Sequence, residues 1–199
     1  MAKAQWVNVA PTEGNGNKTV NVSGEVHTGR QARATTLTIT AADCEDVLVT
    51  VNQAGKAEYV DQQDTATAVK LGQSLTISGK SNSKTLTFSL GNGNLDITLP
   101  PTYIANSVTT TNGEPIVGDP GLNSEYDFSI QLTVAKNDTT SDKTRQLKVT
   151  DEAGHVDICT ITQAAGDPTL SVSKNTIELA YTGEAQSFDV ISNTNWTIA

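Results

Sequence analysis

Residues 29–55 and 139–165 of this 199-residue chain carry the same pattern at a constant offset in residue number. Gln53, for example, falls on Gln163, which sets the offset at 110 (163 − 53 = 110). Self-similarity at a fixed period indicates that one structural unit is used more than once. We therefore expect tandem modules of similar fold, with a third unit begun after residue 167. The same register joins Leu37 with Leu147, Ile39 with Val149, Val20 with Ile130 and Val22 with Leu132.

Apolar and polar residues alternate over several short segments, as in 35–40 and 84–90, and these segments are separated by turn-forming Gly, Pro, Asn and Asp. This pattern predicts short antiparallel strands with one wet face, arranged as β-sandwiches. The pattern weakens in residues 56–72, which we expect to be a linker. Residues 73–167 are expected to form a complete second module, with a long irregular stretch at 100–125.

The formal net charge of −9 constrains the partners of the chain. An acidic surface repels phosphate backbones and anionic lipid, so we expect no nucleic-acid partner and no membrane partner. Residues 1–6 (MAKAQW) contain no apolar run, so no export signal is expected. The two cysteines, Cys44 and Cys159, do not form a disulfide framework.

The two ends of the chain carry motifs that are similar to those of a known family. Residues 6–16 read WVNVAPTEGNG and residues 192–196 read SNTNW. Together they resemble the BACON module, an immunoglobulin-like sandwich found in proteins of gut Bacteroidetes and of phages that infect them. In that family the SNTxW stretch comes before the tryptophan-valine stretch, whereas here the order is reversed. The resemblance implies an all-β chain of tandem immunoglobulin-like β-sandwiches, one of them split between the N- and C-terminal segments.

The split module would consist of residues 1–55 plus 168–199. Neither piece is expected to be stable alone. The C-terminal piece has too few strands for an independent core, so its apolar residues would be left in water. The module could be completed within one chain or by a neighbouring chain, and the sequence leaves both closures open. The residues predicted at the seam are Trp6, Val7, Val9, Phe188, Val190, Trp196 and Ile198.

Residues with chemical reactivity are scattered along the chain. His27 and His155 each stand alone, without the nucleophile that a catalytic pair needs. We therefore predict no enzymatic activity, no cofactor and no metal ion. The 100–125 loop is a candidate for contact with a partner, through Tyr103, Ile104, Ile116 and Val117.

The family resemblance also suggests a function. It implies a non-enzymatic structural protein that decorates the capsid, or an auxiliary head protein, of a phage that infects Bacteroidetes. Such a protein is made in the host cytoplasm, resides in the virion, and binds capsid proteins or copies of itself. The alternative is a carbohydrate- or mucin-binding adhesion module that is secreted or lies on the bacterial surface. That alternative predicts exposed tryptophans and binding to a glycan.

Overall fold

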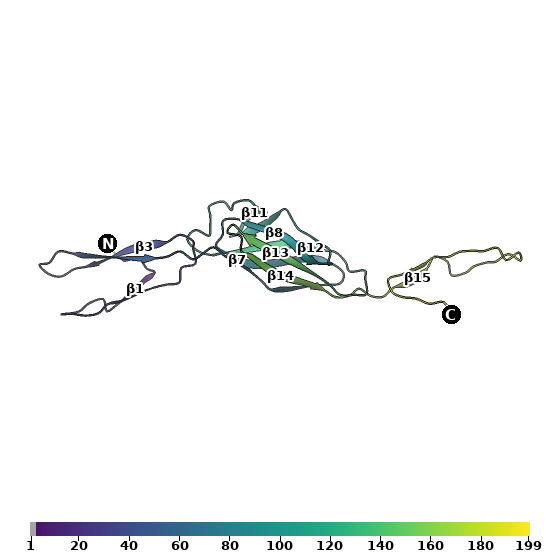
Figure 1. Cartoon of the computed structure of the whole chain (residues 1–199), viewed down its shortest axis with the longest axis horizontal. Helices are drawn as coiled ribbons and strands as arrows, with labels where there is room; N and C mark the ends of the chain where they lie inside the picture. Colours follow the sequence, from purple (N-terminus) through teal and green to yellow (C-terminus); the bar gives the residue numbers. More distant parts are fainter. Residues whose placement is uncertain (1–2) are drawn as a thin grey trace.

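The structure, a computed structural model, describes residues 3–199, and the regular elements in this range are all β-strands. This confirms the predicted all-β class. A sandwich formed by residues 56–167, the central module, lies between two extended hairpin segments at its opposite ends (Figure 1). We name residues 3–55 the N arm and residues 168–199 the C arm. Within residues 3–199 there is no helix with the length and apolar character needed to cross a bilayer.

The central module consists of two facing sheets. Six strands form one sheet, in the order β11-β10-β12-β7-β5 with β9 also paired to β12, and four strands form the other, in the order β6-β14-β13-β8. The strands are β5 (Val60–Gln62), β6 (Thr65–Ala68), β7 (Gln73–Ser81), β8 (Leu86–Gly93), β9 (Ile97–Thr98), β10 (Thr102–Ala105), β11 (Val108–Thr111), β12 (Tyr126–Val134), β13 (Lys143–Asp151) and β14 (Val156–Gln163).

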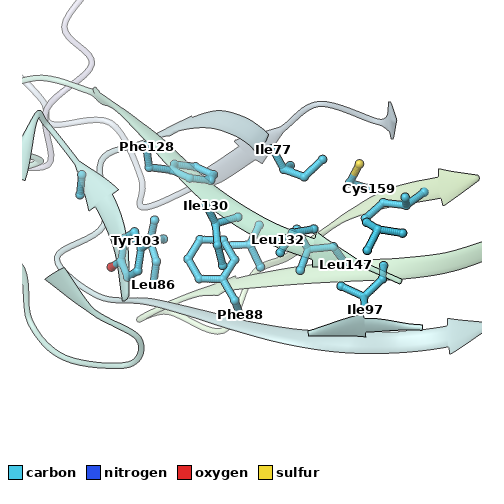
Figure 2. Packing of buried hydrophobic residues seen from close by; sticks show 14 of the residues in the cluster. Ile77, Leu86, Phe88, Ile97, Tyr103, Phe128, Ile130, Leu132, Leu147 and Cys159 are labelled. Carbon is cyan, nitrogen blue, oxygen red and sulfur yellow. The ribbon is translucent and has the colours of Figure 1, made fainter. Parts of the chain in front are cut away.

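The core lies between these sheets because their strands alternate in side-chain direction. Along β12, Phe128, Ile130 and Leu132 are all buried, with polar residues between them facing outward. The ring of Phe88 meets those of Tyr103 and Phe128 edge-on, at centroid distances of 4.9 and 5.8 Å (Figure 2). Such aromatic contacts add to the stabilisation that comes from burial alone.

Residues 56–72 are not a linker, because they contain β5 and β6. Strand β5 pairs antiparallel with β7, and β6 pairs parallel with β14. Most of their inward positions carry small or polar side chains, namely Ala66 and Ala68 on β6 and Gln62 on β5, and only Val60 on β5 is a larger apolar residue. Gln62 is only 3% exposed, and its Nε2 donates to the carbonyl oxygens of Leu147 and Asp157, both at 3.0 Å. A buried polar residue and two alanines produce almost no hydrophobic periodicity, which explains the wrong prediction.

Each arm is built from isolated two-stranded ladders. In the N arm, β1 (Val7–Ala10) pairs with β2 (Asn21–Gly24), and β3 (Arg33–Ile39) pairs with β4 (Val47–Gln53). In the C arm, β15 (Leu170–Val172) pairs with β16 (Val190–Ser192). Two-stranded hairpins are marginal in water, so these arms lack the packing that stabilises the central module.

Candidate functional site

The N arm repeats the geometry of the last hairpin of the central module. Across β3 and β4, Arg33 pairs with Gln53, and the equivalent pair across β13 and β14 is Lys143 with Gln163, at the offset of the sequence repeat (163 − 53 = 110). Gln53 Nε2 donates to Glu25 O at 2.8 Å, and the equivalent Gln163 Nε2 donates to Ala135 O at the same 2.8 Å. The N arm is therefore folded as the second half of a module.

This register places apolar residues of the N arm at positions that form the core of the central module. The central residues are at most 1% exposed: Ile130, Leu132, Val149 and Cys159. Their N-arm equivalents are 48%, 43%, 55% and 42% exposed, in the order Val20, Val22, Ile39 and Val49. The N arm thus presents to solvent the sheet face that is buried in the central module, and such a face is unusual on a soluble domain.

The predicted seam residues of the N arm lie on or beside β1. Val7 is fully buried and Val9 is half-buried, and both lie opposite residues of β2. The guanidinium of Arg33 lies 4.5 Å from the centre of the Trp6 ring, which is half-buried. Cation–π contact of this kind holds the start of the N arm against β3.

The C arm repeats the first hairpin of the central module. Ser173 N donates to Asp189 O at 2.9 Å, and Asp189 N donates to Ser173 Oγ at 2.7 Å. In the central module, Gln63 N donates to Ser78 O at 3.1 Å, and Ser78 N donates to Gln63 Oε1 at 3.2 Å. Ser173 aligns with Gln63 at the repeat offset (173 − 63 = 110), and Asp189 aligns with Ser78 one position later (189 − 78 = 111). The C arm is therefore folded as the first half of a module, with a single insertion between the two positions.

Gly183 supports this alignment, because it has a φ of 72° and matches Gly72, which has a φ of 82°, at the same shifted offset (183 − 72 = 111). Beyond Gly183 the alignment places Phe188, which is 42% exposed, at the position of Ile77, which is fully buried. Trp196 and Ile198 are 48% and 73% exposed. The C arm thus also presents core-forming residues to solvent.

The junction between the N arm and the central module is organised by Asn82, whose side chain is fully buried. Asn82 Oδ1 accepts from Tyr59 N at 3.0 Å, and Asn82 Nδ2 donates to Thr28 O at 3.1 Å and to Ala57 O at 3.2 Å. Thr28 belongs to the N arm and the other two residues to the central module. One amide side chain therefore joins consecutive units.

Asn193 makes the same contacts at the junction between the central module and the C arm. It aligns with Asn82 at the shifted offset (193 − 82 = 111), and its three partners align with those of Asn82 at the repeat offset (169 − 59 = 138 − 28 = 167 − 57 = 110). Its contacts are with Thr169 N at 2.8 Å, Asp138 O at 2.9 Å and Asp167 O at 2.9 Å. The three units are thus connected in one repeated geometry.

We expect Asn82→Ala to destabilise the central module by about 1–3 kcal/mol, because it leaves partly buried backbone groups without their partner. Urea unfolding followed by circular dichroism measures this change. Hydrogen exchange at Tyr59 N should accelerate at the same time, since this amide donates to Asn82 Oδ1. The exposed Thr109→Ala variant serves as the control and should change the unfolding free energy by less than about 0.5 kcal/mol. Unchanged exchange at Tyr59 would contradict the hydrogen bond from this amide to Asn82 Oδ1.

The seam residues of the two arms are not brought together within one chain. Trp6, Val7 and Val9 lie in the N arm, and Phe188, Val190, Trp196 and Ile198 lie in the C arm. The arms extend from opposite ends of the central module (Figure 1). Of the two closures that the sequence leaves open, the within-chain closure is not formed in this structure.

The residues proposed as a contact loop divide into two groups. Tyr103 and Ile116 are buried in the core, at 2% and 1% exposure. Ile104 and Val117 are exposed, at 47% and 86%. Residues 100–125, which we expected to be irregular, also contain the hairpin formed by β10 and β11.

The end of this stretch makes a contact that the sequence pattern did not predict. Arg30 N donates to Gly121 O at 3.1 Å, and Gln31 N donates to Leu122 O at 2.8 Å. The Arg30 side chain also forms an ion pair with Asp119. These contacts attach the base of the N arm to the central module.

The acidic and histidine side chains of the described residues serve structural contacts where the structure shows their partners. Within residues 3–199 no group of three or more His, Cys, Asp or Glu side chains is placed to hold a metal ion. His155 Nδ1 and N both bond the buried carboxylate of Asp151, at 2.8 Å each, which closes the turn between β13 and β14. The arrangement is that of a structural turn.

The two cysteines differ in accessibility, Cys44 being exposed and Cys159 buried. Burial raises the pKa of the Cys159 thiol to about 11, with smaller contributions from Asp157 and Asp64. We expect Ellman's reagent at about pH 8 to modify only Cys44 in the folded chain, because reaction requires an accessible thiolate. A Cys44→Ser variant should react only once urea unfolds the central module. Equal labelling rates for both thiols in the folded chain would be inconsistent with this structure.

Comparisons with known proteins show similarity to solved structures and to one protein family. A protein from Bacteroides thetaiotaomicron solved by NMR is 12% identical, with 64% of this chain and 96% of that chain covered and a TM-score of 0.27. Domains 4 and 5 of the S-layer protein SbsC are 14% identical, with 73% of this chain and 62% of that chain covered and a TM-score of 0.28. No curated protein matches the chain. Residues 1–54 match the BACON family, described as "Putative binding domain, N-terminal", which confirms the BACON-type resemblance of the N-terminal segment.

Proposed function

We propose that this chain is a non-enzymatic structural protein whose modules serve for binding and assembly. The observation that carries this proposal is the pair of hairpin arms, which expose core-forming residues such as Val49 and Phe188 at opposite ends of a packed module. Surfaces of this kind bind other proteins or assemble. The match of residues 1–54 to a binding domain supports the same conclusion.

The place of action in this proposal is the virion of a phage that infects Bacteroidetes, where the chain decorates the capsid as an auxiliary head protein. It would be made in the host cytoplasm and would bind capsid proteins or other copies of itself. Fold alone does not determine function, so the virion location needs other support. That support is the BACON resemblance together with the repeated modular architecture. Ile104 and Val117, both exposed, are the candidate contact residues on the central module.

Mass spectrometry of purified virions tests the location. The expected result is a peptide signal from this chain at a constant ratio to the major capsid protein through successive density gradients. Immunogold labelling should then place the chain on the head. Loss of the chain during purification, at a rate matching that of host proteins, would refute the virion proposal.

A second candidate function is carbohydrate or mucin binding at a cell surface. It is favoured by Trp196, which is 48% exposed, and by Tyr181, which is fully exposed. Aromatic faces of this kind stack on sugar rings. Saturable binding to a glycan array that is lost in Trp196→Ala and Tyr181→Ala would support this function. Absence of binding at any glycan would leave assembly as the role of these residues.

A further inference from the structure

We propose that the C arm of one copy completes the N arm of a second copy, so that the two arms form one closed sandwich. This inference names the partner and rests on the proposed assembly function. The central module is the template, because its first half repeats the C arm and its second half repeats the N arm. Each contact between these halves predicts a contact between the arms of two copies.

The first predicted contact joins the C arm to β2. In the central module β7 pairs with β12, with Ile77 opposite Ile130. The equivalent residues are Phe188 in the C arm (188 − 77 = 111) and Val20 in the N arm (130 − 20 = 110). One side of β2 pairs with β1, as one side of β12 pairs with β9. The opposite side of β2 would receive residues 186–190 of the second copy.

The second predicted contact joins the C arm to β4. In the central module β6 lies parallel to β14, with Ala66 opposite Ile161 and Ala68 opposite Gln163. The equivalent pairs are Ile177 with Val51 and Leu179 with Gln53. Leu179 is 64% exposed in the separate chain. Larger side chains at these positions would fill the space between the sheets of the assembled module more fully than the two alanines do.

Gln53 has a specific role in this second contact. In the central module, Gln163 Nε2 donates to both Ala135 O and Val69 O, at 2.8 and 2.9 Å. Gln53 already makes the equivalent of the first bond, to Glu25 O at 2.8 Å. The equivalent of Val69 is Ala180 of the C arm, in the shifted register fixed by Gly183 (180 − 69 = 183 − 72 = 111). The N arm thus presents a preorganised donor to the second copy.

The third predicted contact joins the end of the C arm to β3. In the central module β8 pairs with β13, with Phe88 opposite Val149. Leu86 and Phe88 point inward after Asn82, and Trp196 and Ile198 take the equivalent places after Asn193. The loop after Asn193 is one residue shorter than the loop after Asn82, which returns the offset from 111 to 110 (196 − 86 = 198 − 88 = 110). This places Ile198 opposite Ile39, whose side chain is 55% exposed in the separate chain. Three segments of one C arm would thereby cover three strand edges of one N arm.

The resulting assembly is open-ended. An interface between two different surfaces of the same chain is heterologous, and it generates filaments when the rotation does not close. The arms lie at opposite ends of the central module, so each copy would bind one neighbour at either end (Figure 1). Asn82 and Asn193 make the same junction contacts, so central and completed modules would alternate in nearly equal geometry.

Disulfide trapping in the full-length chain tests the predicted register. In a Cys44→Ser background, Val20→Cys combined with Phe188→Cys places the new cysteines opposite each other in two copies. The matched control combines Val20→Cys with Ser187→Cys, because a shift of one residue turns the side chain to the opposite face. Both pairs lie outside the central module, whose urea unfolding verifies that each variant is folded. Non-reducing electrophoresis separates the products.

The proposal predicts a ladder of covalent multimers for the Phe188 pair and at least about tenfold less crosslinking for the Ser187 pair, whose cysteines would face opposite sides of the sheet. Equal ladders from both pairs, an intrachain disulfide, or a monomer that does not crosslink would each overturn it. Crosslinking that yields only dimers would contradict the prediction of an open-ended filament. This crosslinking experiment needs only the purified chain. A negative crosslinking result can therefore be distinguished from a failure to find the protein in virions.

Discussion

Phe188→Asp should convert an assembling chain into a monomer. Phe188 occupies the position of the buried Ile77, so it would enter the core of a completed module. The substitution removes a large buried side chain and places a carboxylate in an apolar site, at a combined cost of about 3 kcal/mol or more. This corresponds to association weakened by about 100-fold or more. Sedimentation velocity over a concentration series measures the change.

Ile191→Asp is the matched control for this prediction. Ile191 is more exposed than Phe188, at 61% against 42%. However, it aligns with Lys80, whose side chain is 57% exposed on the outer face of β7. Non-specific hydrophobic association would be weakened at least as much by Ile191→Asp. A specific completed sandwich predicts that only Phe188→Asp abolishes assembly, and equal effects would contradict it.

Val49→Asp should block assembly from the other end of the chain. Val49 aligns with the fully buried Cys159, so its side chain would face the core once a C arm docks. A carboxylate there would be buried without a partner, which should weaken association by about 100-fold or more. Equilibrium sedimentation of the variant should give a single species near the chain mass of 20.9 kDa.

The control for Val49→Asp is its neighbour on β4, Leu48→Asp. Leu48 is 65% exposed and aligns with Ile158, which is 39% exposed on the outer face of β14. Because adjacent residues of a strand point to opposite faces, the two variants separate the inner face from the outer one. We expect Leu48→Asp to assemble like the unmodified chain. If Leu48→Asp were the more damaging variant, the inner face of the N arm would not be the docking surface.

The repeat predicted the parts of the fold that depend on alternating apolar residues. The register that joins Gln53 with Gln163 is also the register of the hairpins that contain them, because one side-chain pattern selects one pairing. The division of a module between residues 1–55 and 168–199 also followed from the order of the motifs. It remains a proposal, supported by the way each arm repeats one half of the central module.

Other features carried too weak a pattern to be predicted. Strands β5 and β6 use Gln62, Ala66 and Ala68 at inward positions, and the hydrogen bonds of a buried glutamine are not visible in a hydrophobic pattern. The β10 and β11 hairpin turns through Asn106 and Ser107, with φ values of 48° and 65°. An Asn-Gly turn would have signalled this hairpin, whereas Asn-Ser does not. The opposite placement of the two arms depends on the junctions, where the side chains of Asn82 and Asn193 bond backbone groups of two units. The backbone partners of an asparagine are not visible in an apolar pattern.

Mixing the two blocked chains isolates the docking of one C arm on one N arm. The Phe188→Asp chain retains an intact N arm, and the Val49→Asp chain retains an intact C arm. Each chain alone should be monomeric, and the mixture should form a one-to-one heterodimer by native mass spectrometry, with no larger species. Two monomers that remain separate in the mixture, or homodimers of either variant, would show that the arms do not complete each other.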